Sequence, residues 1–411
     1  MREIPLILKR TQLIKNMKHL TITVIVILFV LLATAQPTGQ SMKALINEDL
    51  RFAAQQYKVL MQTLPANLMP KTYDAGKKEL VTSNTKWWCS GFYPGTLWLI
   101  YEGTKDSTIK TEAEKRLALV EPEKNFAPNH DVGFKMFCSF GTAYRITKNP
   151  AYKDVILTSA NTLTTRYRPS IQSIQSWDSN ANFKCPVIID NMMNLELLEW
   201  AAQNGGEKRF DQIAVNHANT TLKNHYRADN SSYHVVDYNL ATGAVSAKKT
   251  HQGYGDESAW SRGQSWGLYG FVVMYRFTKD TVYLSQARKI AAFILHHPNL
   301  PADKIPYWDF NAPDIPNAKR DASAAAVMAS ALLELGQYTK GNEKQNYINA
   351  AGKIIQTLSS PAYRAAAGAN GGFLLEHSVG SIPGNSEVDV PLTYADYYFV
   401  EALLRYRKWY L

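Results

Sequence analysis

Apolar residues recur at helical spacing through almost the whole chain beyond its first 40 positions. Strand-like alternation is confined to short pieces such as residues 233–238. The pattern predicts an all-α protein. The predicted helices cover residues 47–64, 92–101, 132–146, 152–167, 192–202, 210–225, 260–277, 283–295, 322–338, 347–358 and 391–410.

A short polar motif recurs between consecutive predicted helices. It reads Ile-Thr-Lys-Asn at 146–149, Phe-Thr-Lys-Asp at 277–280 and Tyr-Thr-Lys-Gly at 338–341, with looser versions at 103–106 and 204–209. A short polar turn between two amphipathic helices makes an antiparallel helical hairpin. Five such turns, together with one more helix pair, predict about six hairpins.

Six hairpins closed into a ring make an (α/α)6 barrel, here a single domain over residues 36–411. An open helical solenoid is the alternative, but it would have more uniform repeats and shorter loops than residues 226–257 or 298–320. In a ring, the long loops are expected at one end, opposite the polar turns. Because long loops in compact domains are usually functional, that end is the predicted site.

Composition excludes several classes of function. The chain has 411 residues, of which 45% are hydrophobic, enough for one large core. The formal charge is +10, but the basic residues form no block beyond the N-terminal segment, so nucleic-acid binding has little support. A mildly basic enzyme acting on an anionic oligosaccharide fits better. The three cysteines, Cys89, Cys138 and Cys185, have no spacing typical of disulfide frameworks or zinc sites.

The N-terminus has the pattern of an export signal. Basic residues precede the apolar run 20–32, which is too short to span a bilayer comfortably, and the small residues of Ala33-Thr34-Ala35 follow. We therefore expect a signal peptide over residues 1–35, with Met17 as a possible true start. The mature protein would be exported to the periplasm without a membrane anchor. A retained anchor is the alternative.

Asp131 and Asp190 each precede a predicted helix. As N-caps they would stabilise their helices by about 1 kcal/mol each. A helix N-terminus lowers the pKa of a carboxyl group, so a general acid here needs burial or a second carboxylate nearby. Two aspartates at the starts of neighbouring inner helices would supply that second carboxylate. The pair is therefore the candidate for acid–base chemistry.

Residues 251–266 combine glycines, tryptophans, a glutamine and an arginine more densely than any other stretch. Glycine lets the backbone approach a ligand, and Trp260 and Trp266 offer flat apolar faces. The guanidinium of Arg262 can bind a carboxylate through two hydrogen bonds. Since a uronic acid presents an apolar face, a rim of hydroxyls and a carboxylate, the mixture suits such a sugar.

A structural role for the same stretch is the alternative. Arg262 would then pair with Asp256 or Glu257, and the tryptophans would belong to the core. Trp88 and Trp177 are further candidates for lining a cleft.

Other chemistries have less support. His130 and His234 lack metal-ligand spacing, so no metal is expected. The serines of residues 258–265 lack a nucleophile-elbow pattern, and no nucleotide-binding glycine motif occurs, so no cofactor is expected.

Four motifs together resemble the unsaturated glucuronyl hydrolases of glycoside hydrolase family 88. They are Asn-His-Asp-Val-Gly-Phe at 129–134, Ile-Asp-Asn-Met-Met-Asn at 189–194, His-Gln-Gly-Tyr at 251–254 and Ser-Ala-Trp-Ser-Arg-Gly-Gln-Ser-Trp-Gly at 258–267. The resemblance extends from about Trp87 to the C-terminus. It implies an (α/α)6 barrel that removes the 4,5-unsaturated uronic acid left by polysaccharide lyases at a non-reducing end.

The resemblance also implies a hydration without a glycosyl-enzyme intermediate. Asp190 matches the acid/base that protonates C4 of the vinyl ether and activates water to attack C5. Asp131 matches a second aspartate, expected to hold ring hydroxyls and to raise the pKa of Asp190. The expected sugar-binding residues are His234, Gln252, Arg262 and Trp266 and, on less distinctive flanking sequence, His130, Trp88, Trp177 and Tyr394. Residues 376–389 are expected near the next sugar or its sulfate.

The predicted function is therefore hydrolysis of unsaturated oligosaccharides derived from glycosaminoglycans such as chondroitin, hyaluronan or heparin. An unsaturated rhamnogalacturonyl hydrolase acting on pectin fragments is the nearest alternative. A non-catalytic glycan-binding protein is another alternative. An epimerase would require a histidine pair as acid and base, and no such pair is evident.

Overall fold

The computed structural model describes residues 40–411, so the expected signal peptide and Met17 lie outside the described residues. The chain has two compact units, Met1–Ala44 and Leu45–Leu411. Of the first unit, the structure describes only residues 40–44, where helix α2 begins. No helix in the described part is long and apolar enough to cross a membrane.

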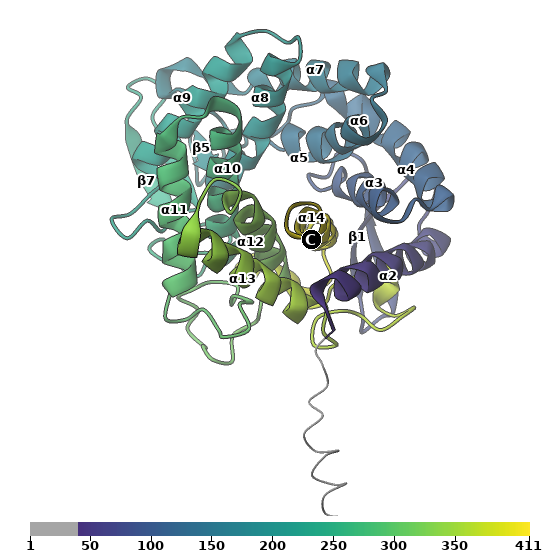
Figure 1. Cartoon of the computed structure of the whole chain (residues 1–411). Coiled ribbons are helices and arrows are strands. Elements are labelled where there is room, and N and C mark those ends of the chain that lie inside the picture. The colour runs from purple at the N-terminus through teal and green to yellow at the C-terminus, as the bar shows by residue number, and fades with distance from the viewer. Residues whose placement is uncertain (1–39) are drawn as a thin grey trace, which may run out of the picture. The chain divides into compact units, whose positions relative to one another are not determined.

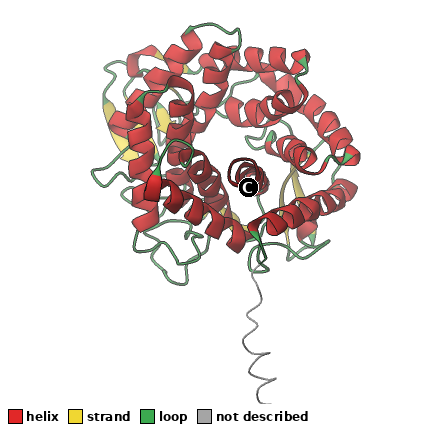
Figure 2. Cartoon of the chain, in the orientation of Figure 1, coloured by secondary structure: helices red, strands yellow, loops and turns green. Residues whose placement is uncertain are grey.

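Helices dominate residues 45–411, and the strands form only small pieces (Figure 2). The α-helices are α2 (Met42–Thr63), α3 (Phe92–Thr104), α4 (Ser107–Val120), α5 (Val132–Met136), α6 (Thr142–Thr147), α7 (Pro150–Thr164), α8 (Leu195–Gln203), α9 (Arg209–Asn224), α10 (Ser261–Thr278), α11 (Thr281–His296), α12 (Ala322–Leu335), α13 (Gly341–Leu358) and α14 (Thr393–Tyr410). Short 3-10 helices form η1 (Glu121–Asn125), η3 (Pro169–Ile171), η4 (Ile189–Asn194) and η5 (Asn370–Gly372), and a π-helical turn forms η2 (Phe137–Gly141).

The inner helices close into a ring (Figure 1). α3 packs on η2 and α6, α5 packs on η4 and α8, and α8 packs on α10. Further around the ring, α10 packs on α12, α12 packs on α14, and α14 packs on α3. The outer helices α4, α7, α9, α11 and α13 each pack on the inner helix that precedes them. The contact between α14 and α3 closes the ring, so the predicted (α/α)6 barrel is confirmed and the open solenoid is wrong.

The two ends of this unit meet at the closure. Tyr57 of α2 donates a hydrogen bond to Asp396 of α14 at 3.1 Å, and its ring stacks on Tyr93 of α3 at 5.8 Å between centroids. The outer helix α2 and the inner helix α14 therefore complete the sixth pair.

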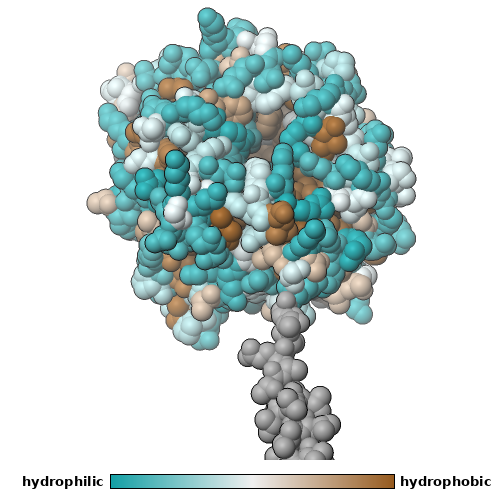
Figure 3. Space-filling model, in the orientation of Figure 1, coloured by the Kyte–Doolittle hydropathy of each residue, from teal (hydrophilic) through white to brown (hydrophobic). Residues whose placement is uncertain are grey.

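Inner and outer helices differ in burial, as the ring architecture requires. Every residue of α12 is buried. In α13, by contrast, the buried positions recur at helical spacing along one side. The surface shown in Figure 3 is accordingly mostly hydrophilic, with apolar residues in small separate patches.

The recurring Thr-Lys turns have a common physical basis. In each of three turns the threonine hydroxyl donates to the carbonyl four residues earlier, and the lysine adopts a left-handed conformation. Asp106, Asn149 and Asp280 then cap the following helices by accepting backbone hydrogen bonds. The motif therefore ends one helix and begins the next within four residues.

Several helix boundaries differ from the prediction. Helix α4 was not predicted, and its buried side includes the charged residues Glu112 and Arg116. The helix predicted over 132–146 is divided into α5, the π-helical turn η2 and α6. The helix predicted from Met192 begins instead at Leu195, after the 3-10 turn η4.

Four small antiparallel sheets occupy the connections. They pair β1 (Met69–Asp74) with β2 (Glu79–Ser83), β3 (Tyr167–Arg168) with β4 (Ser173–Ile174), β6 (Val235–Tyr238) with both β5 (Pro186–Ile188) and β7 (Val245–Lys249), and β8 (Ser378–Ser381) with β9 (Ser386–Val390). In the β5–β6 pair, Ile188 is opposite Val235, directly before the turn that carries Asp190. The strands thus hold the long loops around the starts of the inner helices.

Candidate active site

Asp131 lies at the start of α5 but does not cap it. Its side chain makes no capping hydrogen bond in the described structure. Instead, Oδ1 lies 3.4 Å from Nε2 of His130. The Nδ1 of that histidine is 3.3 Å from the side-chain nitrogen Nδ2 of Asn194. The capping interpretation is therefore wrong for this residue, and its carboxyl group is directed toward the interior.

Asp190 likewise lies inside the 3-10 turn η4 rather than at a capping position. It is held there because Ile189 donates its backbone N–H to the carbonyl of His234 at 3.0 Å. No described residue donates a hydrogen bond to Oδ2 of Asp190, although that oxygen is buried. A buried carboxylate oxygen without a donor is costly and indicates a site built for something else to bind.

A close approach of two chain segments brings the aspartates together. Phe134 donates its backbone N–H to Oδ1 of Asn194 at 2.8 Å. A Cβ atom at Gly133 would lie only 2.5 Å from that oxygen and 2.6 Å from Cα of Asn194. Only glycine therefore lets α5 lie this close to η4.

His234 faces Asp190 across a gap too long for a hydrogen bond. Its Nδ1 accepts backbone hydrogen bonds from His251 and Gln252, each at 3.2 Å. The other nitrogen, Nε2, therefore carries the proton in the neutral ring, and it lies 3.7 Å from Oδ2 of Asp190. Nε2 is also buried without a hydrogen-bond partner in the described structure. The His234 ring packs on Trp260 at 4.5 Å between centroids.

Burial sets the protonation of this cluster. It raises the pKa of Asp131 to about 7, against the opposing charge of Lys135. Burial also raises the pKa of Asp190 to about 6, and the Asp131 carboxylate adds to that rise. The predicted effect of Asp131 thus has the right direction, but desolvation is the larger cause. The pKa of His130 falls to about 4 because its charged form is desolvated.

Arg262 lies at the site, but its ion-pair partner is neither Asp256 nor Glu257. Its guanidinium pairs with Asp321 at 3.0 Å and donates to the carbonyls of Val379 and Gly380. Both charged side chains are at most 1% exposed. Neither Asp256 nor Glu257 pairs with Arg262, because the first bonds Lys249 and the second Arg227. Arg262 therefore joins α10 to α12 and β8.

The predicted aromatic residues belong to two packing groups, one around Trp266 and one around Tyr394. Trp266 is fully buried and packs on Phe134 and Tyr398. Tyr394 is also buried, and it packs at 4.9 Å between ring centroids on Trp88, which is half-buried.

The remaining predicted residues lie in or beside the loop 251–260. Trp177 is half-buried and packs on Phe183 and His251. Gln252 is half-buried and donates from its side chain to Gly380 at 3.1 Å. The structure thus brings the predicted residues into one region.

Two supporting residues were not predicted as site residues. Asp321 holds Arg262 and caps α12, and Asn194 bridges His130 and Phe134. Asn194 lies in the motif 189–194 and Asp321 directly follows the long loop 298–320, but their roles depend on partners distant in sequence. Within residues 40–411, no group of three or more metal-binding side chains occurs.

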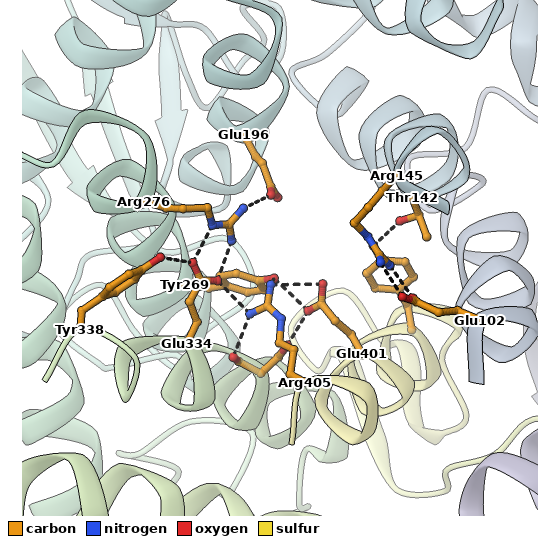
Figure 4. Close-up of polar contacts among 12 residues, drawn as sticks. Glu102, Thr142, Arg145, Glu196, Tyr269, Arg276, Glu334, Tyr338, Glu401 and Arg405 are labelled. Atoms are coloured by element: carbon orange, nitrogen blue, oxygen red, sulfur yellow. Dashed lines mark hydrogen bonds and ion pairs between the residues drawn. The ribbon is translucent and has the colours of Figure 1, made fainter. Parts of the chain in front are cut away.

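A cavity of about 790 Å³ lies at the other end of the inner helices, and Figure 4 shows charged residues that line it. Arg276 pairs there with Glu196 and Glu334, and Arg405 pairs with Glu334 and Glu401. Arg276 follows Arg262 by 14 positions on α10, which corresponds to about 21 Å along the helix. This cavity is therefore separate from the aspartate site.

Known proteins are similar to this chain in sequence and in fold. Residues 63–360 match the family described as Glycosyl Hydrolase Family 88. A relative from Formosa agariphila, named unsaturated glucuronyl hydrolase, is 46% identical over 350 residues, covering 85% of this chain and 87% of the relative. A crystal structure of an unsaturated glucuronyl hydrolase specific for heparin is 42% identical with a TM-score of 0.86, covering 89% of this chain and 97% of that chain.

A third similar structure contains a ligand. It is a variant of the unsaturated glucuronyl hydrolase from Streptococcus agalactiae complexed with dGlcA-GalNAc6S, 28% identical with a TM-score of 0.77, covering 90% of this chain and 94% of that chain. The family match spans most of the chain, and the enzyme class expected from the four motifs is confirmed. The chain belongs to glycoside hydrolase family 88.

Proposed function

We propose that this enzyme removes the 4,5-unsaturated uronic acid from the non-reducing end of glycosaminoglycan oligosaccharides released by polysaccharide lyases. The observation that carries the proposal is Asp190. Its carboxyl group is buried, its pKa is raised to about 6, and its Oδ2 has no hydrogen-bond donor among the described residues. The substrates named for similar enzymes support the same class of sugar.

The proposed reaction is a hydration. Protonated Asp190 gives its proton to C4 of the substrate, and positive charge develops on C5 and the ring oxygen. A water molecule adds to C5 and gives a proton to the Asp190 carboxylate, which restores the acid. The resulting hemiketal opens and releases the shortened oligosaccharide. A raised pKa suits this cycle because the same group must both donate and accept a proton near neutrality.

The neighbouring residues have supporting roles in this proposal. Asp131 holds ring hydroxyls and helps to keep the proton on Asp190. His234 directs its Nε2–H toward the substrate beside Oδ2 of Asp190. Arg262 supplies positive charge for the uronate carboxylate, while Gln252, His130, Trp88, Trp177, Trp266 and Tyr394 shape the binding region.

The location of the enzyme is part of the proposal. The apolar run 20–32 and the small residues after it support export of the protein to the periplasm. N-terminal sequencing of the protein recovered from the periplasm tests this expectation, which requires a new N-terminus near Gln36.

The decisive experiment is a panel of lyase products. The conjugated double bond of the uronic acid absorbs ultraviolet light, and hydration removes that absorbance. We expect turnover of chondroitin, hyaluronan or heparin disaccharides. Turnover of pectin-derived products alone would instead indicate a rhamnogalacturonyl hydrolase. Binding without any turnover would indicate a glycan-binding protein.

A further inference from the structure

Each aspartate of the site faces the Nε2 atom of a buried histidine. Nε2 of His130 lies 3.4 Å from Oδ1 of Asp131, and Nε2 of His234 lies 3.7 Å from Oδ2 of Asp190. Both imidazole rings are at most 4% exposed, and burial lowers the pKa of each, so both rings are neutral at neutral pH. A neutral imidazole carries one proton. The nitrogen that carries it decides whether the aspartate faces a hydrogen-bond donor or a base.

The tautomer of His130 follows from the orientation of the Asn194 side chain. The backbone N–H of Phe134 donates to Oδ1 of Asn194 at 2.8 Å, so the oxygen of the side-chain amide faces Phe134. The amide nitrogen Nδ2 of Asn194 then lies 3.3 Å from Nδ1 of His130. Because an amide nitrogen only donates hydrogen bonds, Nδ1 of His130 is the acceptor. The proton of the neutral ring is therefore on Nε2, facing Asp131.

The surrounding structure opposes the reversed orientation of this amide. Asn194 is fully buried. Turning its side chain over would place the NH2 group against the N–H of Phe134, leaving donors buried without an acceptor, which costs about 1–3 kcal/mol for each such group. The main chain of His130 is held separately, because its N–H donates to the carbonyl of Ser176 at 2.9 Å. Neither partner of the Asn194–His130 contact is therefore free to rearrange.

His234 has the same tautomer from a different source. Its Nδ1 accepts backbone hydrogen bonds from His251 and Gln252, each at 3.2 Å. Those two donors belong to the main chain, so they remain when a side chain is substituted. At His130, by contrast, the tautomer depends on one side chain. A single substitution at Asn194 can therefore change His130 and leave His234 as it is.

We propose that Asn194 is a positioning residue that holds His130 in the Nε2-protonated tautomer, so that a hydrogen-bond donor and not a base faces Asp131. In the opposite tautomer, a bare Nε2 would face Asp131 and accept the proton of its carboxyl group. With both histidines protonated on Nε2, the transferable proton of the site stays on the two carboxyl groups, and Asp190 delivers it to C4 of the substrate. This inference rests on the proposed function.

Nuclear magnetic resonance of the wild-type enzyme tests the tautomer directly. In a neutral imidazole ring, the nitrogen that carries the proton and the bare nitrogen have well-separated resonances. A proton–nitrogen correlation spectrum of enzyme labelled with isotopic histidine therefore identifies both atoms. His130→Gln assigns the signals of His130 among the nine histidines of the chain. We expect the proton of His130 on Nε2, and a proton on Nδ1 overturns the inference.

Asn194→Asp tests whether the amide determines the tautomer. Aspartate has the same shape and still accepts the hydrogen bond from Phe134, but it presents an oxygen in place of Nδ2. His130 should then carry a proton on Nδ1, whereas His234, the internal control in the same spectrum, should keep its proton on Nε2. An unchanged protonation of His130 in this variant contradicts the role of Asn194.

Turnover of an unsaturated disaccharide separates positioning from a merely structural role. In Asn194→Asp, kcat should fall by about tenfold or more with little change in KM, because His130 then draws the proton away from the carboxyl groups. An unchanged kcat overturns the inference. The wild-type spectrum does not depend on the folding of the variant, and it reports the tautomer with or without turnover. Failure of the proposed function would differ, since the wild type would hydrate no disaccharide.

Discussion

The two ends of the inner helices both bury arginines and carboxylates, but they differ in how those groups are partnered. At the end with the cavity, Glu334 forms ion pairs with both Arg276 and Arg405 (Figure 4). At the other end, buried atoms of Asp190 and His234 lack hydrogen-bond partners within residues 40–411. The paired charges stabilise the structure, whereas the unpaired atoms of Asp190 and His234 can form hydrogen bonds with a ligand.

The difference matters because a cavity alone does not identify a functional site. The cavity of about 790 Å³ is lined with charges, yet Arg276, Arg405 and their glutamate partners already form ion pairs with one another. A ligand there would have to compete with existing ion pairs. At the aspartate end, a substrate can supply bonds that the protein leaves unmade.

The largest expected effect is on catalysis at the aspartate end. Asp190→Asn keeps the shape but removes the proton that the reaction transfers, so kcat/KM should fall by about 10² to 10⁴-fold. Loss of ultraviolet absorbance from a good disaccharide substrate measures the rate. If neither Asp190→Asn nor Asp131→Asn lowers turnover, the assignment of this end is wrong.

At the other end, the expected effect is on stability instead. Glu334→Gln leaves Arg276 and Arg405 without their shared partner and should reduce the free energy of unfolding by about 3–5 kcal/mol. Chemical denaturation measures the loss, while the activity per folded molecule should be unchanged. Glu102→Gln removes the more exposed pair with Arg145 and should cost less than about 1 kcal/mol. Loss of activity without loss of stability in Glu334→Gln would contradict the comparison.

The pH dependence of the rate sharpens the role of the aspartates. Because burial raises the pKa of Asp190 to about 6, its protonated fraction falls as the pH rises through that value, and so should kcat/KM. Asp131→Asn removes a neighbouring charge that helps to raise this pKa, so the fall should begin at lower pH. A profile of kcat/KM for wild type and variant checks the direction. An unchanged midpoint in the variant would show that the two carboxyl groups titrate independently.

The smallest expected effect concerns a buried carboxyl group outside both ends. Burial, with a smaller contribution from Asp211, raises the pKa of Glu199 to about 8, and neither of its oxygens has a hydrogen-bond donor in the described structure. A raised pKa stabilises the fold at low pH, and this contribution is lost as the pH rises through about 8. Glu199→Gln should therefore stabilise the protein more at pH 9 than at pH 6. The gain in the free energy of unfolding over the wild type should be about 1–2 kcal/mol larger at pH 9. Thermal unfolding of both proteins at the two pH values measures the difference.

Much of the fold could be predicted because it depends on local chemistry. The Thr-Lys turns were visible because a threonine, a left-handed lysine and a capping aspartate or asparagine act within four residues. The helix break at η2 and the 3-10 turn at η4 could not be read in the same way. They depend on packing between segments, such as the contact of Gly133 with Asn194.

The site residues were predictable as members of motifs, but not by their interactions. Arg262 was predicted as part of the site region, but its partner Asp321 lies 59 positions away in sequence. Glu387 and Asp389 were equivalent in the sequence. Only the structure shows that Lys319 and His377 donate hydrogen bonds to Asp389, whereas no described residue donates one to Oε1 of Glu387.

By itself, the sequence determined the helical hairpins, their number and the family, because periodicity, turn chemistry and motifs are local along the chain. The tertiary structure alone decided the protonation of Asp131 and Asp190 and the partners of Arg262. The physical reason is that desolvation and ion pairing depend on every segment packed around a group. Asp190 was a candidate acid from the sequence, but the burial that raises its pKa exists only in the closed ring.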